Sequence, residues 1–208
     1  VQWKGKKHSL KEVLIDVVRS GDIRLVPDRF NSTYFHWVEN LQDWCISRQI
    51  WWGHRIPVYY RDNEKRVSLQ KPEPFKGWEQ DPDTLDTWFS SALWTWSTLI
   101  DPELAKNYSL SLEDVLERSP DFQKFHPTDI METGYDILFF WVARMILMTT
   151  YMLQEVPFKT VYLHGLIRTR DGKKMSKSDP KSVIDPLDSI EKYGADALRI
   201  ALVSGTGP

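Results

Sequence analysis

Sulfur and long apolar runs are scarce in this sequence. Cys45 is the only cysteine among the 208 residues, which excludes an internal disulfide and a cysteine-based zinc site within this chain. No window has the unbroken apolar length that spans a bilayer, and residues 1–7 lack the apolar core of a signal peptide. We therefore expect a cytoplasmic protein with no membrane partner and no protein-bound zinc.

The chain also lacks a large excess of charge of either sign. The chain carries 27 basic and 29 acidic residues, for a net charge of -2, and its pI is near 6.2. Overall electrostatics therefore give no case for a nucleic-acid partner, and any such contact would depend on local basic patches. By contrast, 41% of the residues are hydrophobic and ten are tryptophan, so we expect a folded chain with a real core.

The apolar periodicity predicts helices and strands along most of the chain. Ser9 and Glu12 have the spacing of a capping box, and Gly21 stands where the helix they begin would stop. Aromatic residues at three- and four-residue steps predict a second helical stretch from about residue 28 to residue 48. The other predicted elements are strands at 56–60, 127–132 and 160–167, helices at 85–99 and 136–151, and polar insertions at 61–80 and 101–125, the second partly helical.

Two predicted strands are each followed by a segment with polar residues. The strand ending near Glu132 leads to Asp136, whereas the strand at 160–167 alternates too little for an exposed strand and suits a buried parallel one. In open α/β sheets, ligands lie beyond the carboxyl ends of the strands. We therefore expect residues 132–136 and 164–178 to meet at one edge of the sheet and to form a single site.

The segment Lys174-Met175-Ser176-Lys177-Ser178 carries the most specific chemistry in the chain. It follows Asp171-Gly172, a pair that favours a loop. Two ammonium groups three residues apart, with hydroxyls between and beside them, suit the phosphates of a nucleotide as pyrophosphate leaves. A solvated basic turn is the alternative interpretation of this segment by itself.

Five further blocks surround this loop in a fixed order. They are residues 44–57 (WCISRQIWWGHRIP), 83–91 (DTLDTWFSS), 132–144 (ETGYDILFFWVAR), 183–186 (VIDP) and 193–199 (YGADALR). In order and wording they resemble the class I aminoacyl-tRNA synthetases, and within them the valyl enzymes, with the isoleucyl and leucyl enzymes as nearest relatives. The resemblance covers almost the whole chain.

The resemblance implies an α/β fold, namely the second half of a Rossmann-like catalytic domain with helical insertions. Residues 1–60 would follow the editing insertion and end in a catalytic-domain strand. Residues 61–81 would form a small lobe, and 82–208 the second half of the nucleotide-binding domain. None of the five histidines lies in the His-x-Gly-His element that the family carries in its first half. We therefore expect little or no activity without an amino-terminal catalytic half, and we expect editing and anticodon binding to reside in other domains of the same enzyme.

The implied activity is that of a valine–tRNA ligase, which activates valine with ATP and Mg2+ and transfers it to tRNA-Val. By resemblance, Lys177 and Lys174 would be catalytic. Asp136 would hold the amino group of valine, while Trp88 and Ile137 would form the apolar walls around its side chain. The residues that the resemblance assigns to ATP are His164, Gly165, Lys174, Met175, Ser176, Lys177 and Ser178.

Each assignment has a plainer alternative. Asp136 suits a helix N-cap, Trp88 and Ile137 suit ordinary core packing, and a lone histidine such as His164 is more often a hydrogen-bonded structural residue. For the whole chain, the alternatives are an isoleucyl-type synthetase and a non-catalytic, synthetase-like module that binds tRNA or protein. Residues 61–80 also lack the cysteine pairs that family members often carry for zinc.

A smaller residue at position 137 separates a valine pocket from an isoleucine pocket. If Ile137 is the wall beside the valine side chain, Ile137→Ala makes room for a larger one. We then expect isoleucine-dependent exchange of pyrophosphate into ATP to rise by roughly tenfold or more, the usual effect of one methylene in such a pocket. Unchanged rejection of isoleucine would exclude Ile137 from the pocket wall.

Overall fold

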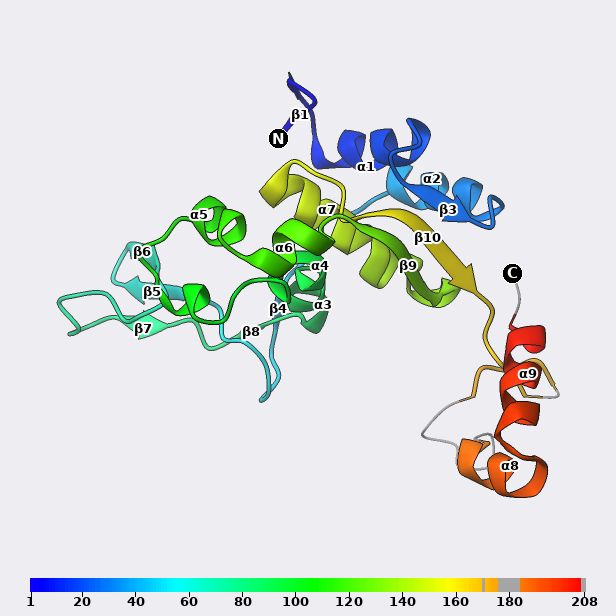
Figure 1. Ribbon diagram of the computed structural model, residues 1–208. Coiled ribbons are helices and arrows are strands. Elements are labelled where there is room, and N and C mark those ends of the chain that lie inside the picture. The colour runs from blue at the N-terminus through cyan, green and yellow to red at the C-terminus, as the bar shows by residue number, and fades with distance from the viewer. Residues whose placement is uncertain (170, 176–183, 207–208) are drawn as a thin grey trace.

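The structure is a computed structural model that describes residues 1–169, 171–175 and 184–206. Its helices are α1 (Leu10–Arg19), α2 (Phe30–Glu39), α3 (Thr87–Ser91), α4 (Trp94–Ser97), α5 (Leu112–Glu117), α6 (Pro120–Phe125), α7 (Ala143–Leu153), α8 (Pro186–Tyr193) and α9 (Ala195–Gly205), with short irregular helical turns at η1 (Leu104–Lys106), η2 (Tyr135–Ile137) and η3 (Leu138–Val142) (Figure 1). Its strands are β1 (Gln2–Trp3), β2 (Lys6–Lys7), β3 (Arg24–Val26), β4 (Ser47–Arg48), β5 (Val58–Arg61), β6 (Glu64–Val67), β7 (Glu79–Gln80), β8 (Thr84–Leu85), β9 (Thr128–Gly134) and β10 (Phe158–His164).

A parallel sheet of three strands, in the order β3-β10-β9, forms the centre of the fold. The pairing of β10 with β9 runs as far as His164 opposite Gly134. The predicted buried parallel strand at 160–167 is therefore confirmed, and its inward residues Val161 and Leu163 are fully buried. The sequence does not predict β3, because three residues are too few to show a periodic pattern.

Helices α1, α2 and α7 share one hydrophobic core with this sheet (Figure 1). The start of α1 confirms the sequence prediction, because Ser9 and Glu12 form a reciprocal capping box. In the core, the hydroxyl of Tyr34 donates to the carbonyl oxygen of Leu14 at 3.0 Å, and burial raises the pKa of Tyr34. Other fully buried members of the core are Val13, Val17, Ile23, Leu25, Val38, Val142, Met145, Ile146 and Phe158.

Three predicted helices are shorter or less regular than the periodicity indicates. The stretch 28–48 is helical only over α2, after which Trp44 leaves the helical path and its indole donates to Asp86 at 2.9 Å. The helix predicted at 85–99 is divided into α3 and α4, and the one predicted at 136–151 begins as η2 and η3 before α7. For the first of these stretches, a tertiary contact overrides the local pattern.

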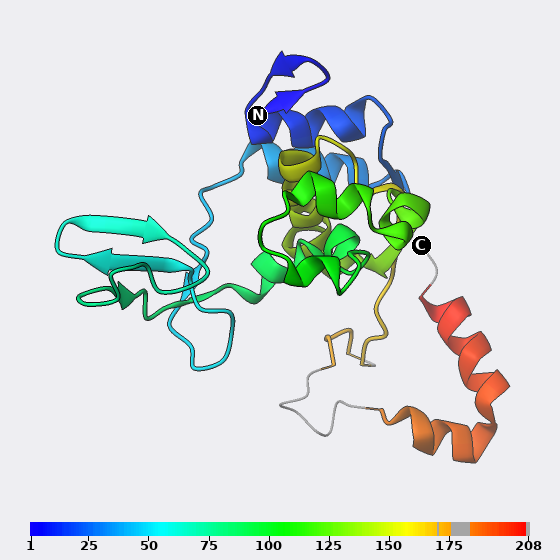
Figure 2. The same ribbon diagram turned by 60° about the vertical axis from the view of Figure 1, so that its left-hand side comes forward.

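The strands β5, β6 and β7 form a separate antiparallel sheet that projects from the core (Figures 1 and 2). Trp78, directly before β7, is 2% exposed. The guanidinium groups of Arg61 and Arg66 lie 4.6 and 5.0 Å from the Trp78 ring. The polar insertion predicted at 61–80 is thus built from strands, whereas the insertion at 101–125 is helical, with α5 and α6.

Helices α8 and α9 form a pair at the opposite end of the molecule from the β5–β7 sheet (Figures 1 and 2). The Gly165 N–H donates to the carbonyl oxygen of Thr206 at 2.8 Å, which ties the end of β10 to the end of α9. Asp185 caps α8 by accepting from the N–H of Leu187 at 2.8 Å. The residues just beyond β10 therefore lie between the sheet and this helix pair.

One helical segment, Tyr135–Leu153, is long and apolar enough by length and composition to cross a bilayer, with a mean hydropathy of 1.4 over its most apolar window. The sequence prediction that no window reaches this length was therefore wrong. Its residues Leu138, Val142, Met145 and Ile146 are buried in the core described above. At these four positions the apolar residues belong to the core, and 39% of the most apolar window is buried within the structure.

A buried position on the central strand should contribute far more to stability than an exposed position on the neighbouring strand. Leu163 on β10 is fully buried, whereas Ile130 on β9 is 66% exposed. We expect Leu163→Ala to lower the free energy of unfolding by about 2–5 kcal/mol, and Ile130→Ala by less than about 1 kcal/mol. Urea unfolding followed by tryptophan fluorescence measures both. Similar midpoints for the two variants would contradict the assignment of β10 to the centre of the core.

Candidate functional site

The carboxyl ends of β9 and β10 lie side by side. Gly134, the last residue of β9, pairs with His164, the last residue of β10. Parallel strands that end together deliver their following segments to the same edge of the sheet. The sequence prediction that residues 132–136 and 164–178 meet at one edge is thereby confirmed for the part of the chain that the structure describes.

Asp136 and Lys174 meet across this edge. The Nζ atom of Lys174 donates to Oδ2 of Asp136 at 2.6 Å, and the Lys174 side chain is 65% exposed against 27% for Asp136. Asp136 does not cap η2, since its N-cap residue is Gly134 and no side-chain cap bond is formed. The N-cap alternative for Asp136 is therefore wrong. Its carboxylate already binds an ammonium group, and it does so in a setting open to solvent.

Gly134 allows the side chain of Asp136 to approach the strand end closely. A Cβ atom at this position would lie 2.8 Å from Oδ1 of Asp136 and 3.1 Å from Cδ2 of Leu166. Both distances are shorter than ordinary contacts, so any side chain here would push the carboxylate away from the strand ends.

The segment before the lysine loop is a tight hairpin fixed to η2. Arg168 and Lys174 form an isolated antiparallel bridge, and Gly172 adopts the left-handed conformation that the turn requires, with a φ of 78°. The guanidinium group of Arg168 donates to the hydroxyl of Tyr135. Lys174 is therefore held where it faces Asp136. The candidate residues Ser176, Lys177 and Ser178 lie outside the described residues.

His164 and Gly165 line a cavity of about 500 Å3 at the same edge. The Nδ1 atom of His164 lies 2.6 Å from the carbonyl oxygen of Gly165, and its Nε2 atom lies 3.2 Å from Oε1 of Glu132. The far wall of the cavity is formed by Leu202 and other residues of α9. Such a space beside strand ends suits a nucleoside. The contact of His164 with Gly165 also fits the alternative that His164 is a hydrogen-bonded structural residue.

Met175 faces a second, mainly apolar cavity. This cavity has a volume of about 330 Å3 and lies between the lysine loop and the α8–α9 pair. Its other walls include Ile167, Ile184 and Leu198. Met175 thus shares this cavity with residues of the helix pair.

Trp88 and Ile137, the predicted pocket walls, come from α3 and η2. Ile137 is half-buried and follows Asp136 directly at the end of η2. Trp88 is half-buried on α3, and its ring stacks on Phe140 of η3 with centroids 6.1 Å apart and planes 29° apart. In the described part of the chain, no hydrogen bond or ring contact joins Trp88 to Asp136 or Lys174. The role of both residues as pocket walls stays a prediction.

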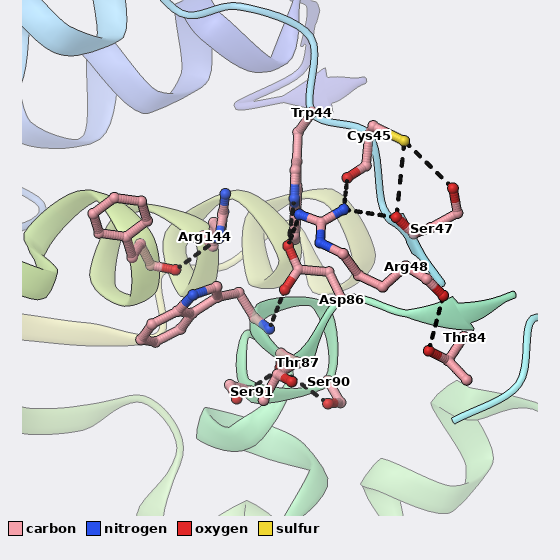
Figure 3. A network of polar contacts seen from close by, with 12 residues as sticks. Trp44, Cys45, Ser47, Arg48, Thr84, Asp86, Thr87, Ser90, Ser91 and Arg144 are labelled. Carbon is pink, nitrogen blue, oxygen red and sulfur yellow. Dashed lines mark hydrogen bonds and ion pairs between the residues drawn. The ribbon is translucent and has the colours of Figure 1, made fainter. Parts of the chain in front are cut away.

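A buried carboxylate holds the start of α3 in place (Figure 3). Oδ1 of Asp86 accepts from the N–H of Trp88 at 3.0 Å. Its Oδ2 accepts from Nε1 of Trp44 at 2.9 Å and from Nη2 of Arg48 at 2.6 Å. The guanidinium group of Arg144 lies 3.9 Å from the Trp44 ring centroid. The network joins three segments that are far apart in the sequence.

The electrostatics of this network favour the ionised carboxylate. Burial alone would raise the pKa of Asp86, but the N–H of Trp88, the indole of Trp44 and the charges of Arg48 and Arg144 outweigh it and lower the pKa below its usual value. Burial lowers the pKa of Arg144. The sequence did not single out Asp86, although an aspartate two residues before Trp88 at a helix start is an N-cap signal.

Sequence reasoning placed Glu132, Tyr135 and Arg168 within the two segments that meet at the edge, but it did not predict their contacts. Their contacts form only when the two strands pair, and no local sequence pattern predicts such contacts. Among residues 1–169, 171–175 and 184–206, no group of three or more histidine, cysteine, aspartate or glutamate side chains is placed to hold a metal ion.

Comparison with known proteins identifies a family for this arrangement. The family model for tRNA synthetases class I (I, L, M and V) matches residues 1–76 and 72–207. The valine–tRNA ligases of Clostridium tetani and Clostridium acetobutylicum are 50% and 49% identical to this chain over 214 residues, covering all of it. The chain spans 23% of the length of each of these relatives.

A solved structure shows the same fold. The methionyl-tRNA synthetase of Mycobacterium tuberculosis, bound by methionyl-adenylate, matches 93% of this chain and 31% of its own, with a TM-score of 0.64 and 18% sequence identity. The expected α/β synthetase fold is therefore confirmed.

Acid should weaken the contribution of Asp86 to stability. Because the pKa of Asp86 is lowered in the folded chain, its ionisation stabilises the fold above the unfolded pKa of about 3.9, and this stability is lost as the pH falls through the folded pKa. We expect Asp86→Asn to cost about 1–3 kcal/mol near neutral pH. That difference from the parent chain should shrink below about pH 4. Urea unfolding at a series of pH values measures it, and a difference that stays constant down to pH 3 would contradict the assignment.

Proposed function

Since this chain belongs to the class I tRNA synthetases of the isoleucine, leucine, methionine and valine group, we propose that it forms part of the catalytic domain of a valine–tRNA ligase. The observation that carries the proposal is the meeting of Asp136 and Lys174 beside the paired ends of β9 and β10. It sets an ammonium-binding carboxylate next to a loop with phosphate-binding chemistry. The roughly 50% identity to valine–tRNA ligases favours valine as the substrate.

The reaction needs positioning more than covalent chemistry. The carboxylate of valine attacks the α-phosphate of ATP, pyrophosphate leaves, and a terminal hydroxyl of tRNA-Val then attacks the valyl carbonyl of the adenylate and displaces AMP. Such a step is accelerated by holding the reactants in line and by placing fixed positive charge where negative charge develops. The described residues supply both kinds of group at one edge of the sheet.

Asp136 would bind the ammonium group of valine. In the structure this carboxylate holds the ammonium group of Lys174 at 2.6 Å, so its surroundings suit the same charge on a substrate. An exposed pair of this kind contributes little to stability, and its exchange for valine therefore costs little. Lys174, once released, would be free to turn toward the phosphates of ATP.

ATP would lie along the edge that His164 and Gly165 occupy. The cavity of about 500 Å3 beside these residues would take the adenosine, and the loop lysines would contact the phosphates. The sequence assigns the main phosphate contact to Lys177, which lies outside the described residues. Mg2+ would enter with ATP, and the proposal assigns no residue of this chain to the ion.

The complete enzyme would carry the remaining steps. The chain spans less than a quarter of the relatives that it matches, so tRNA-Val binding and catalytic turnover are proposed for the whole protein. An apolar pocket rejects side chains of similar shape only weakly. We therefore propose that removal of wrongly activated amino acids takes place in a separate editing domain.

Valine-dependent exchange of pyrophosphate into ATP tests the proposal. The chain is placed in the Clostridium tetani ligase in exchange for the segment that it matches, and it is also assayed by itself. We expect exchange in the chimera with valine preferred over isoleucine. Asp136→Asn should lower kcat/KM for valine by roughly 10- to 150-fold, the effect of losing a hydrogen bond between charged groups.

Two lysine variants provide the matched comparison. Lys174→Ala should lower kcat/KM for ATP by roughly tenfold or more. Lys173→Ala should stay within about twofold of the parent, because its ammonium group pairs with exposed Asp171 at 3.1 Å and not with Asp136. A folded chimera without valine-dependent exchange would contradict the proposed function and favour a non-catalytic binding module. A preference for isoleucine would reassign the substrate.

A further inference from the structure

Asp86 is the one charged residue among the buried residues of the described chain, with 5% of its surface exposed. Removing a carboxylate from water is costly unless hydrogen bonds and opposite charges compensate it. The compensation here is complete on both oxygens, as Figure 3 shows. A buried carboxylate with both oxygens compensated in this way indicates a role beyond filling the core.

A helix cap alone does not require a carboxylate. An asparagine or serine at position 86 would accept equally well from the N–H of Trp88. The additional acceptor, Oδ2, takes the indole N–H of Trp44 and the guanidinium group of Arg48. Both donors come from the segment 44–48, which is otherwise attached here by the short β4–β8 ladder and the bond from the Asp86 N–H to the carbonyl oxygen of Ile46 at 2.7 Å.

The helix that Asp86 begins is too short to fix its own direction. α3 has five residues, and isolated turns of this length are not stable in water. Trp88 is the second residue of α3, so the hydrogen bond from its N–H to Asp86 sets where its backbone lies. On the other side its ring stacks on Phe140, in the turn that directly follows Ile137.

The segment 44–48 is itself held firmly at the network. Arg144 on α7 covers the Trp44 ring at 3.9 Å, and Nη1 of Arg48 donates to the carbonyl oxygens of Cys45 and Ser47 at 2.6 and 2.7 Å. A shift of this segment would therefore be transmitted through Asp86 to Trp88.

We propose that Asp86 is a positioning residue for the amino-acid pocket: together with Trp44 and Arg48 it fixes the start of α3, and thereby the placement of the Trp88 indole that faces the substrate side chain. This inference rests on the proposed function, in which Trp88 is a pocket wall. It also gives the sequence block at residues 44–48 a role, which the sequence by itself did not supply.

Steady-state pyrophosphate exchange by the same chimera tests the proposal. Asp86→Asn keeps an acceptor for the Trp88 N–H but cannot accept from both Trp44 and Arg48. Misplacing one wall should weaken valine binding without touching ATP. We expect the KM for valine to rise by roughly tenfold or more, with the KM for ATP and kcat within about twofold.

Two further variants keep the test decisive. Trp44→Phe retains a ring beneath Arg144 and removes one donor, so it should raise the KM for valine in the same direction by a smaller factor. Arg48→Gln removes the second donor, the guanidinium group, from a side chain that is 40% exposed. If Asp86→Asn does not fold, these two variants must show the same selective rise.

Asp101→Asn is the matched control. Asp101 also accepts from the N–H two residues further on, that of Glu103 at 2.8 Å, at the start of the short turn η1. It lies in the insertion at 101–125 and should leave both KM values unchanged.

The outcomes distinguish this inference from the proposed function. Absence of valine-dependent exchange in the parent chimera would count against the function, and the positioning role would fall with it. Exchange in the parent together with an unchanged KM for valine in Asp86→Asn and Trp44→Phe would overturn the positioning role alone. Equal rises in the KM for valine and in the KM for ATP would also overturn it, because a residue that positions only the amino-acid pocket should affect valine alone.

Discussion

The in-register parallel pairing of β9 with β10 is the contact on which the candidate site depends. This pairing runs to Gly134 opposite His164, so both strands end at the same edge of the sheet. Lys174 can therefore contact Asp136, which lies 38 residues earlier in the sequence. Burial of the inward residues of β10 fixes the register, since a slip by one residue would turn Leu163 out of the core. The position of the site residues therefore depends on the same packing that fixes the register of β10.

Two aspartates near the proposed amino-acid pocket use their charge in different ways. Asp86 is buried and satisfied on both oxygens, so exchanging its partners would leave a buried charge unpaired and would be costly. Asp136 lies at the open edge and pairs with a largely exposed lysine, so it can exchange that ammonium group for another at little cost. A pocket needs both kinds, one to hold its walls and one to receive the substrate.

The sequence predicted those features that depend on local chemistry. The capping box at Ser9, the buried strand that became β10 and the meeting of two strand ends are all confirmed. The length of α2 was overestimated, because a periodic pattern does not reveal the hydrogen bond from Trp44 to Asp86. The contacts of Tyr135, Arg168 and Asp86 were missed for the same reason: they join segments that only the folded sheet and helices bring together. The roles given to Trp88, Ile137 and Lys177 stay predictions.

A structure of the chimera with a non-hydrolysable valyl-adenylate analogue tests the central claim most directly. The account predicts that the ammonium group of the valyl moiety lies about 3 Å from the Asp136 carboxylate, that Lys174 has left that carboxylate, and that the adenosine lies beside His164 and Gly165. An analogue bound elsewhere, with the contact between Lys174 and Asp136 intact, would contradict it.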